Sequence, residues 1–353
     1  MKKTQLNSRR NFIKNSALIG VGISSPINSF AIVKNTEKTN EIIGHGDFKY
    51  KVDKKWGEQN PNNFPVNHCH EMVMDKRNRI LMTTTHPKNN ILIYNQSGKI
   101  EDSWSIGYSG SHGLTIVDEG GEEFLYITDP DAHKVCKTDL KGRKILEFDY
   151  PKEIKEYSSK DDFKPTETTV TPNGDIFIAD GYGKDFIIKY DSKGNYIKHF
   201  GGHGEKSDQF DCCHGITVDT RRNNNNSSLL ISSRTKNEFK RFDFEGNHIE
   251  TISLPGCWIC RPVIKGNNLF FAVITTESWW NYDGMLAVLD NNNKVVSMPG
   301  GSIPKYSNKI MEKPVYDDKT FLNPHDVCVD NDDNLYVPQW NSGKTYPLKL
   351  IRI

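Results

Sequence analysis

The sequence predicts an all-β fold, a six-bladed β-propeller of four-stranded blades. Six stretches of about 40–55 residues share one pattern of short strands and turns, which is typical of propeller blades. Within each stretch, strands rich in Ile, Val, Phe and Tyr alternate with Asp, Asn and Gly turns. Gly and Asn recur roughly every 8–12 residues, a spacing that argues against long helices.

Each repeated unit opens with an apolar strand, passes through a polar turn into a second strand, and ends in a D-x-x-G hairpin before a fourth strand. The units start at His70, His112, Thr166, His214, Arg261 and His325. We therefore expect the propeller to span residues 67–353, with residues 32–66 adding the outer strand that closes the ring. A seven-bladed ring that uses residues 41–66 is the alternative.

The N-terminus has the pattern of an export signal. Arg9 and Arg10 follow two lysines and precede Phe12, Ile13 and Lys14, the arrangement of a twin-arginine signal. A short apolar stretch over residues 17–23 and small residues before position 32 complete it. We expect residues 1–31 to be a signal peptide read by the twin-arginine export machinery, and the mature protein to work in the periplasm or outside the cell.

Charge and hydropathy exclude several classes of protein. The chain has 353 residues, with 46 Lys and Arg against 45 Asp and Glu, so its formal net charge is +1. Nucleic-acid and anionic-membrane binders generally need a basic excess. No apolar run reaches the roughly 20 residues of a spanning helix. We expect no nucleic-acid partner and no transmembrane segment in the mature chain.

Three histidines occupy the same register in alternate units. His112, His214 and His325 each stand directly before the first apolar strand of units two, four and six. Alternate blades of a six-fold ring are related by about 120°, and the innermost strands of a propeller line its central channel. The three imidazoles are therefore expected to meet at one point. Three histidines with an open position form the ligand set of a catalytic zinc ion.

The chain also carries more specific motifs. They are Ser111–Leu114, Thr128-Asp129 with His133–Val135, Pro165–Glu167 with Asp180–Tyr182, His214 with Ser233-Arg234, and Pro324–Asp326. The repeats resemble the NHL family of six-bladed propellers. The motifs, in this order and in these blades, resemble the peptidyl-α-hydroxyglycine α-amidating lyase family.

The resemblance implies roles for particular residues. His112, His214 and His325 become zinc ligands, and Tyr182 and Arg234 become catalytic residues beside the metal. Asp326 and the backbone carbonyl of Leu114 become ligands of a structural calcium ion, which prefers oxygen donors. The implied reaction breaks the C–N bond of a carbinolamide after a hydroxyl proton is removed, which leaves an amide and an aldehyde.

The chain departs from the family in the expected substrate site. The family grips the substrate carboxylate with a blade-one arginine, and the matching stretch Thr83–His86 contains none. We therefore expect other substrate contacts, from Arg261, His70 and His86, with Trp279 and Trp280 as a second possibility for stacking against a sugar. His70 shares the register of the other histidines, so the roles of metal ligand and structural residue also stay open for it.

Three functions are compatible with these observations. The first is an exported zinc-dependent lyase that acts on a small-molecule, peptide or glycan substrate. The second is a non-catalytic propeller that binds protein or glycan. The third is a carbohydrate-processing hydrolase or lactonase, although calcium lactonases hold their metal with carboxylate and Asn ligands. The histidines in register favour the lyase.

Overall fold

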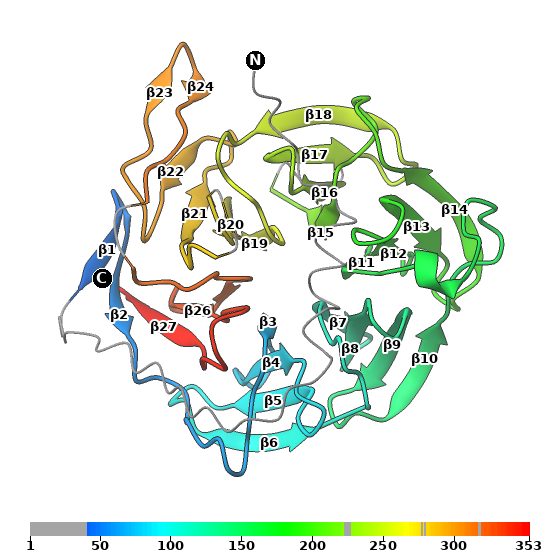
Figure 1. Cartoon of the computed structure of the whole chain (residues 1–353), viewed down its shortest axis with the longest axis horizontal. Helices are drawn as coiled ribbons and strands as arrows, with labels where there is room; N and C mark the ends of the chain where they lie inside the picture. The colour runs from blue at the N-terminus through cyan, green and yellow to red at the C-terminus, as the bar shows by residue number, and fades with distance from the viewer. Residues whose placement is uncertain (1–40, 222–226, 277, 279, 317–318) are drawn as a thin grey trace, which may run out of the picture. The chain divides into compact units, whose positions relative to one another are not determined.

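The computed structural model describes residues 41–221, 227–276, 278, 280–316 and 319–353. The expected signal peptide, residues 1–31, lies outside this range. Within residues 41–353, six sheets are arranged in a ring, each with one edge strand toward the centre and the other at the rim (Figure 1). The predicted six-bladed β-propeller is confirmed.

Blades one to five are antiparallel sheets of four strands that follow one another in the chain. From the innermost strand outward, blade one consists of β3 (Cys69–Met74), β4 (Ile80–Thr84), β5 (Ile91–Tyr94) and β6 (Ile100–Trp104), and blade two of β7 (Leu114–Glu119), β8 (Glu122–Asp129), β9 (Lys134–Asp139) and β10 (Lys144–Phe148). Blade three consists of β11 (Glu167–Val170), β12 (Ile176–Ala179), β13 (Phe186–Tyr190) and β14 (Tyr196–Gly201), and blade four of β15 (Cys213–Asp219), β16 (Ser228–Ser233), β17 (Glu238–Phe242) and β18 (His248–Ser253). Blade five consists of β19 (Val263–Lys265), β20 (Asn268–Val273), β21 (Met285–Leu289) and β22 (Val295–Ser297).

Blade six is built from both ends of the described chain. Its inner strands are β25 (Cys328–Val329), β26 (Leu335–Val337) and β27 (Leu348–Arg352), and its outer strands are β2 (Phe48–Asp53) and β1 (Ile42–His45). β2 pairs antiparallel with β27, with Tyr50 opposite Arg352. In the chain, a 3₁₀ turn, η2 (Lys160–Asp162), follows blade two. A separate hairpin of β23 (Tyr306–Ser307) and β24 (Ile310–Met311) follows blade five.

The hydrophobic core is divided among the interfaces between neighbouring blades. One cluster joins blades two and three through Tyr126, Phe148, Ile176 and Ile188, and five further clusters fill the other interfaces around the ring. Because the strands are buried on both faces, β4, β5 and β12 consist of uninterrupted buried residues. Burial of one such side chain contributes about 1.5–3 kcal/mol to folding.

The innermost strands also contact one another around the ring. β3 packs against β7, β7 against β11, β11 against β15, β15 against β19, β19 against β25, and β25 against β3. The residues that precede or begin these strands are thereby brought together at the centre. Over the described ranges, no helix is long and apolar enough to cross a membrane.

Candidate metal centre

Six residues, one from each blade, occupy equivalent places at the start of the innermost strands. We call them the inner row: His70, His112, Thr166, His214, Cys260 and His325. In four of them, the backbone N–H donates to a carbonyl oxygen in or directly after the second strand of the same blade, at 2.8–3.0 Å. The pairs are His112 with Thr128, Thr166 with Ala179, Cys260 with Ala272, and His325 with Pro338. His70 and His214 lie where the register between the first and second strands shifts.

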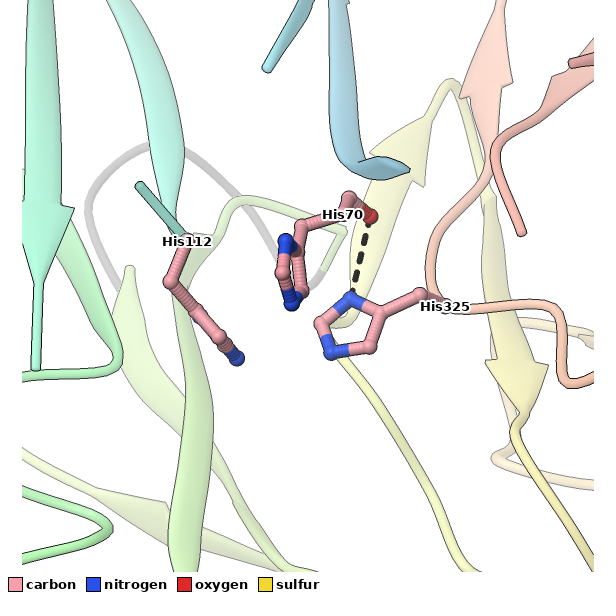
Figure 2. Close-up of side chains that lie close together, drawn as sticks. All are labelled: His70, His112 and His325. Atoms are coloured by element: carbon pink, nitrogen blue, oxygen red, sulfur yellow. Dashed lines mark hydrogen bonds between the residues drawn. The ribbon is translucent and has the colours of Figure 1, made fainter. Parts of the chain in front are cut away.

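Four imidazole rings of the inner row converge. The ring centroids of His112 lie 4.6–4.8 Å from those of His70, His214 and His325. The ring nitrogens of His70, His112 and His325 that face one another lie within 4.8 Å, and Figure 2 shows these three rings pointing at a common point. The Nε2 atom of His214 lies 3.2 Å from Nε2 of His112. The structure thus brings together the three histidines predicted as ligands, and adds His70.

Backbone carbonyls fix the orientation of two of these rings. Nδ1 of His112 lies 2.9 Å from the carbonyl oxygen of Thr166, and Nδ1 of His325 lies 3.0 Å from that of His70. A carbonyl oxygen only accepts hydrogen bonds, so both Nδ1 atoms carry the proton. The Nε2 lone pairs of His112 and His325 are therefore free to bind a metal ion, a device common among metal-binding histidines.

The electrostatics of the site keep these imidazoles neutral. Burial lowers the pKa of His112 to about 3, and the nearby Arg234 guanidinium adds to the effect. Burial and neighbouring cations also lower the pKa of His70, His214 and His325 well below the ordinary value. A neutral imidazole is the form that ligates a metal.

The donor set fits a tetrahedral ion such as zinc. With Zn–N bonds of about 2.0–2.1 Å, two ligand nitrogens of a tetrahedral site stand about 3.3 Å apart, close to the 3.2 Å between Nε2 of His112 and Nε2 of His214. Nδ1 of His70 and Nδ1 of His214 are buried without a hydrogen-bond partner among the described residues. Neither of these two nitrogens is therefore occupied by a protein group of the described residues.

Tyr182 and Arg234 lie beside the histidines, as the resemblance implied. The Tyr182 hydroxyl is 3.3 Å from Nε2 of His112 and 3.1 Å from Nε2 of His214. Nη1 of Arg234 donates to that hydroxyl at 3.3 Å, while its Nε and Nη2 are held by the Ile259 carbonyl and the Cys260 sulfur. Arg234 lowers the pKa of Tyr182, but burial is the larger effect and the pKa is raised overall. The phenol is therefore protonated near neutral pH.

The loop that carries Tyr182 is fixed by the carboxylate of Asp180. This carboxylate accepts hydrogen bonds from the backbone N–H groups of Lys164 and Lys184 at 2.6 Å and from the Tyr157 hydroxyl at 2.7 Å. Gly183 is required here, because an added Cβ would lie 2.0 Å from a carboxylate oxygen of Asp180. A side chain at this position would therefore force the loop to move.

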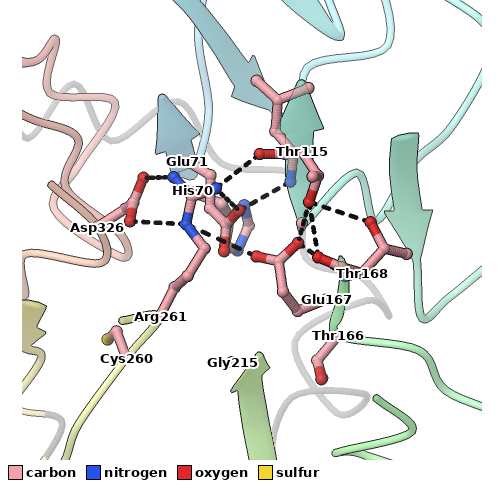
Figure 3. A network of polar contacts seen from close by, with 12 residues as sticks. His70, Glu71, Thr115, Thr166, Glu167, Thr168, Gly215, Cys260, Arg261 and Asp326 are labelled. Carbon is pink, nitrogen blue, oxygen red and sulfur yellow. Dashed lines mark hydrogen bonds and ion pairs between the residues drawn. The ribbon is translucent and has the colours of Figure 1, made fainter. Parts of the chain in front are cut away.

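The residues that directly follow the inner row form a second, charged layer. We call them the second row: Glu71, Gly113, Glu167, Gly215, Arg261 and Asp326 (Figure 3 labels all but Gly113). Arg261 donates to Oδ1 of Asp326 at 3.2 Å, to Oδ2 of Asp326 at 2.6 Å, to the Leu114 carbonyl at 2.9 Å and to the Met72 carbonyl at 3.0 Å. It also forms ion pairs with Glu71 at 3.5 Å and Glu167 at 3.8 Å.

The two glycines of the second row allow close approach of neighbouring blades. A Cβ added at Gly113 would lie 2.5 Å from the Thr166 carbonyl oxygen, and one at Gly215 would lie 2.5 Å from the Cα atom of Arg261. Neither gap admits a side chain. The glycine after His112 and after His214 is thus a packing requirement of the ring.

Two expectations do not fit this geometry. Arg261 was expected to contact substrate, but its guanidinium is buried and engaged by carboxylates and backbone carbonyls. Asp326 and the Leu114 carbonyl were expected to bind calcium, but both accept hydrogen bonds from Arg261 instead. The residues therefore do not fit the expected calcium ion.

No described contact joins His86 or Trp280 to the histidine cluster. His86 is partly exposed, and its described hydrogen bonds join it to Thr84, Lys88, Asn89 and Asn90. Trp280 is exposed, and Trp279 lies outside the described residues. The prediction missed Glu71 and Glu167. Their signal was their position, one residue after the register that the histidines define.

Comparison with known proteins was consistent with the motifs. A probable peptidyl-alpha-hydroxyglycine alpha-amidating lyase of Caenorhabditis elegans is 35% identical over 131 residues, 36% of this chain and 37% of that protein. Peptidyl-alpha-hydroxyglycine alpha-amidating lyase 1 of Drosophila melanogaster is 23% identical over 341 residues, 90% of this chain and 57% of that protein. The chain resembles amidating lyases. Its matches span between about a third and somewhat more than half of these relatives' lengths.

No family model matches the chain. Among solved structures, a streptogramin B lyase aligns with a TM-score of 0.54 at 16% identity, over 82% of this chain and 94% of that one. Hydrazine synthase of Kuenenia stuttgartiensis aligns with a TM-score of 0.53 at 10% identity, over 84% and 99%. At such identities these likenesses support the propeller fold alone.

Proposed function

We propose that the chain is a metal-dependent lyase that cleaves a carbinolamide, as its amidating-lyase relatives are named for doing. The observation that carries the proposal is the place of the Tyr182 hydroxyl. It lies within 3.3 Å of two ligand-type histidine nitrogens and of a buried guanidinium. A purely structural propeller has no need of a phenol, four neutral imidazoles and an arginine in one place.

His112, His214 and His325 would hold the ion, with His70 beside them as a fourth ligand or a contact to substrate. When bound, a zinc ion would lower the pKa of a substrate hydroxyl and so favour loss of its proton. The lowered histidine pKa values keep the nitrogen lone pairs available for this role.

Tyr182 would relay the proton between the two ends of the breaking bond. Its Oη gives its own proton to the departing amide nitrogen and takes the proton of the substrate hydroxyl. The hydroxyl carbon becomes an aldehyde carbonyl as the C–N bond breaks, and the nitrogen leaves as a primary amide, so atoms and charges balance without a co-reactant. Arg234 stabilises negative charge that develops on Oη.

The direct test is a peptide that ends in α-hydroxyglycine, incubated with metal-loaded protein while peptide amide and glyoxylate are measured. We expect both products in equal amounts. Because Thr83–His86 holds no arginine, the methyl ester of the same peptide is expected to react about as well as the free acid. If metal-loaded protein turns over neither the free acid nor its methyl ester, the proposal of a carbinolamide lyase is refuted.

We also propose that the protein is exported by the twin-arginine route. The support is the motif from Ser8 to Lys14 and the apolar stretch after it. The expected result is protein in the periplasm or culture medium, and retention in the cytoplasm when Arg9 and Arg10 are both replaced by Lys. Export that is unaffected by the double substitution would contradict this route.

A further inference from the structure

We propose that the guanidinium of Arg261 is a built-in cation that ties the inner strands together where the resemblance implies a calcium ion, and that the folded chain therefore needs no calcium. The observation is direct competition for the same atoms. Both carboxylate oxygens of Asp326 and the carbonyl oxygen of Leu114, the expected calcium ligands, accept hydrogen bonds from Arg261.

The geometry suits an arginine better than a calcium ion. Asp326 faces Arg261 with both oxygens, which matches the planar fork of a guanidinium. Calcium takes six to eight oxygen ligands at about 2.3–2.6 Å. With Arg261 present, these oxygens already have a cation at hydrogen-bond distance, and a calcium ion would have to displace it.

Arg261 links most of the ring. It precedes β19 of blade five and reaches the Met72 carbonyl of blade one, the Leu114 carbonyl of blade two and Asp326 of blade six, with Glu167 of blade three as an ion-pair partner. The acceptors are in turn fixed by their neighbours. Oδ2 of Asp326 accepts the Met72 N–H at 3.0 Å, and Oε2 of Glu71 accepts the Leu114 N–H at 2.8 Å.

Arg261 also offsets part of the negative charge that surrounds it. Three buried carboxylates, those of Glu71, Glu167 and Asp326, surround one buried guanidinium. Removal of that single cation would leave buried carboxylates without compensation, which is strongly destabilising. It would also free the oxygens that bind calcium, so the variant is expected to acquire a calcium requirement.

The test measures thermal unfolding of the full chain, dialysed into calcium-free buffer, with and without millimolar calcium chloride. For the wild type we expect no change in Tm with calcium, and no calcium by elemental analysis. Arg261→Met is expected to unfold at a lower temperature and to recover about 3 °C or more when calcium is added. Magnesium chloride in place of calcium is expected to restore less, because magnesium demands octahedral geometry.

Arg241→Met is the matched control. Arg241 is also a buried arginine held by carboxylates, at 2.9 Å from Asp219 and 2.7 Å from Glu250, but it lies on β17, away from the centre. This variant should lose stability without gaining a calcium response. A wild-type Tm that rises with calcium, or one bound calcium per wild-type chain, would overturn the proposal even if Arg261→Met does not fold. So would an Arg261→Met protein as stable as wild type without calcium. None of these readouts depends on lyase activity.

Discussion

Nε2 of His112 and Nε2 of His214 lie 3.2 Å apart, although the two residues belong to blades two and four. Nδ1 of His112 donates to a backbone carbonyl, so its Nε2 presents a lone pair. A cation between the two nitrogens would turn this close contact into shared ligation.

Replacement of His214 by Ala should therefore lower the bound metal well below one ion per chain. The measurement is elemental mass spectrometry of protein purified without added metals or chelators. His248→Ala is the control, because His248 lies on β18 at the rim and contacts Thr251. Equal metal content in wild type and His214→Ala would exclude His214 as a ligand.

Replacement of Tyr182 by Phe should abolish most activity while metal content stays unchanged. Loss of a proton-transfer group typically costs about 10²–10⁴-fold in rate, and Phe retains the packing of the ring. Tyr196→Phe, on outer strand β14, removes a hydroxyl that bonds to His199 and serves as the control. A Tyr182→Phe enzyme with wild-type kcat would rule out the proton relay.

Blade four should show acid sensitivity that depends on Asp219. Burial works against its ionisation, but hydrogen bonds from Arg221, with the charge of Arg241, lower the pKa of Asp219 to about 2. A carboxylate with a lowered folded-state pKa stabilises the fold above its unfolded pKa, which is near 3.8, and this stabilisation is lost as the pH falls toward 2. We expect Asp219→Asn to cost about 2 kcal/mol at pH 7. In urea titrations, the difference in free energy of unfolding between Asp219→Asn and wild type should narrow as the pH falls from about 6 to about 3. A difference that does not change with pH would contradict the assignment.

The second-row glycines should not tolerate even a methyl group. Gly113→Ala places a Cβ 2.5 Å from a backbone oxygen, so the blades must move apart or the strand must shift. Overpacking of this kind costs about 1–3 kcal/mol. Both Gly113→Ala and Gly215→Ala should lower Tm, and unchanged melting of both would show that the ring adjusts freely.

The sequence was sufficient to predict the blades and the convergence of three histidines. Both follow from periodicity and from a shared register, which are properties of the sequence. His70 shares the register of the other three, so the sequence left the roles of metal ligand, substrate contact and structural residue open for it. Only the closed ring shows that its imidazole lies 4.6 Å from that of His112.

The role of Arg261 could not be predicted from the sequence either. It was interpreted as a substrate contact because the stretch Thr83–His86 lacks the arginine that the resemblance implies. Its actual partners, Asp326, Met72 and Leu114, are contributed by three other blades. Only the closed ring brings these groups together, so no local pattern indicates them.

The pairing of β2 with β27 has a consequence for how the protein folds. Tyr50 lies opposite Arg352, so β2, the strand that closes the ring, pairs with a strand 302 positions later in the chain. During synthesis, the early blades are exposed for a long time with an open edge, and such distant pairing slows folding. A ribosome-stalled chain that lacks β27 should therefore be readily digested by protease, and resistance should arise in a single step when β27 emerges.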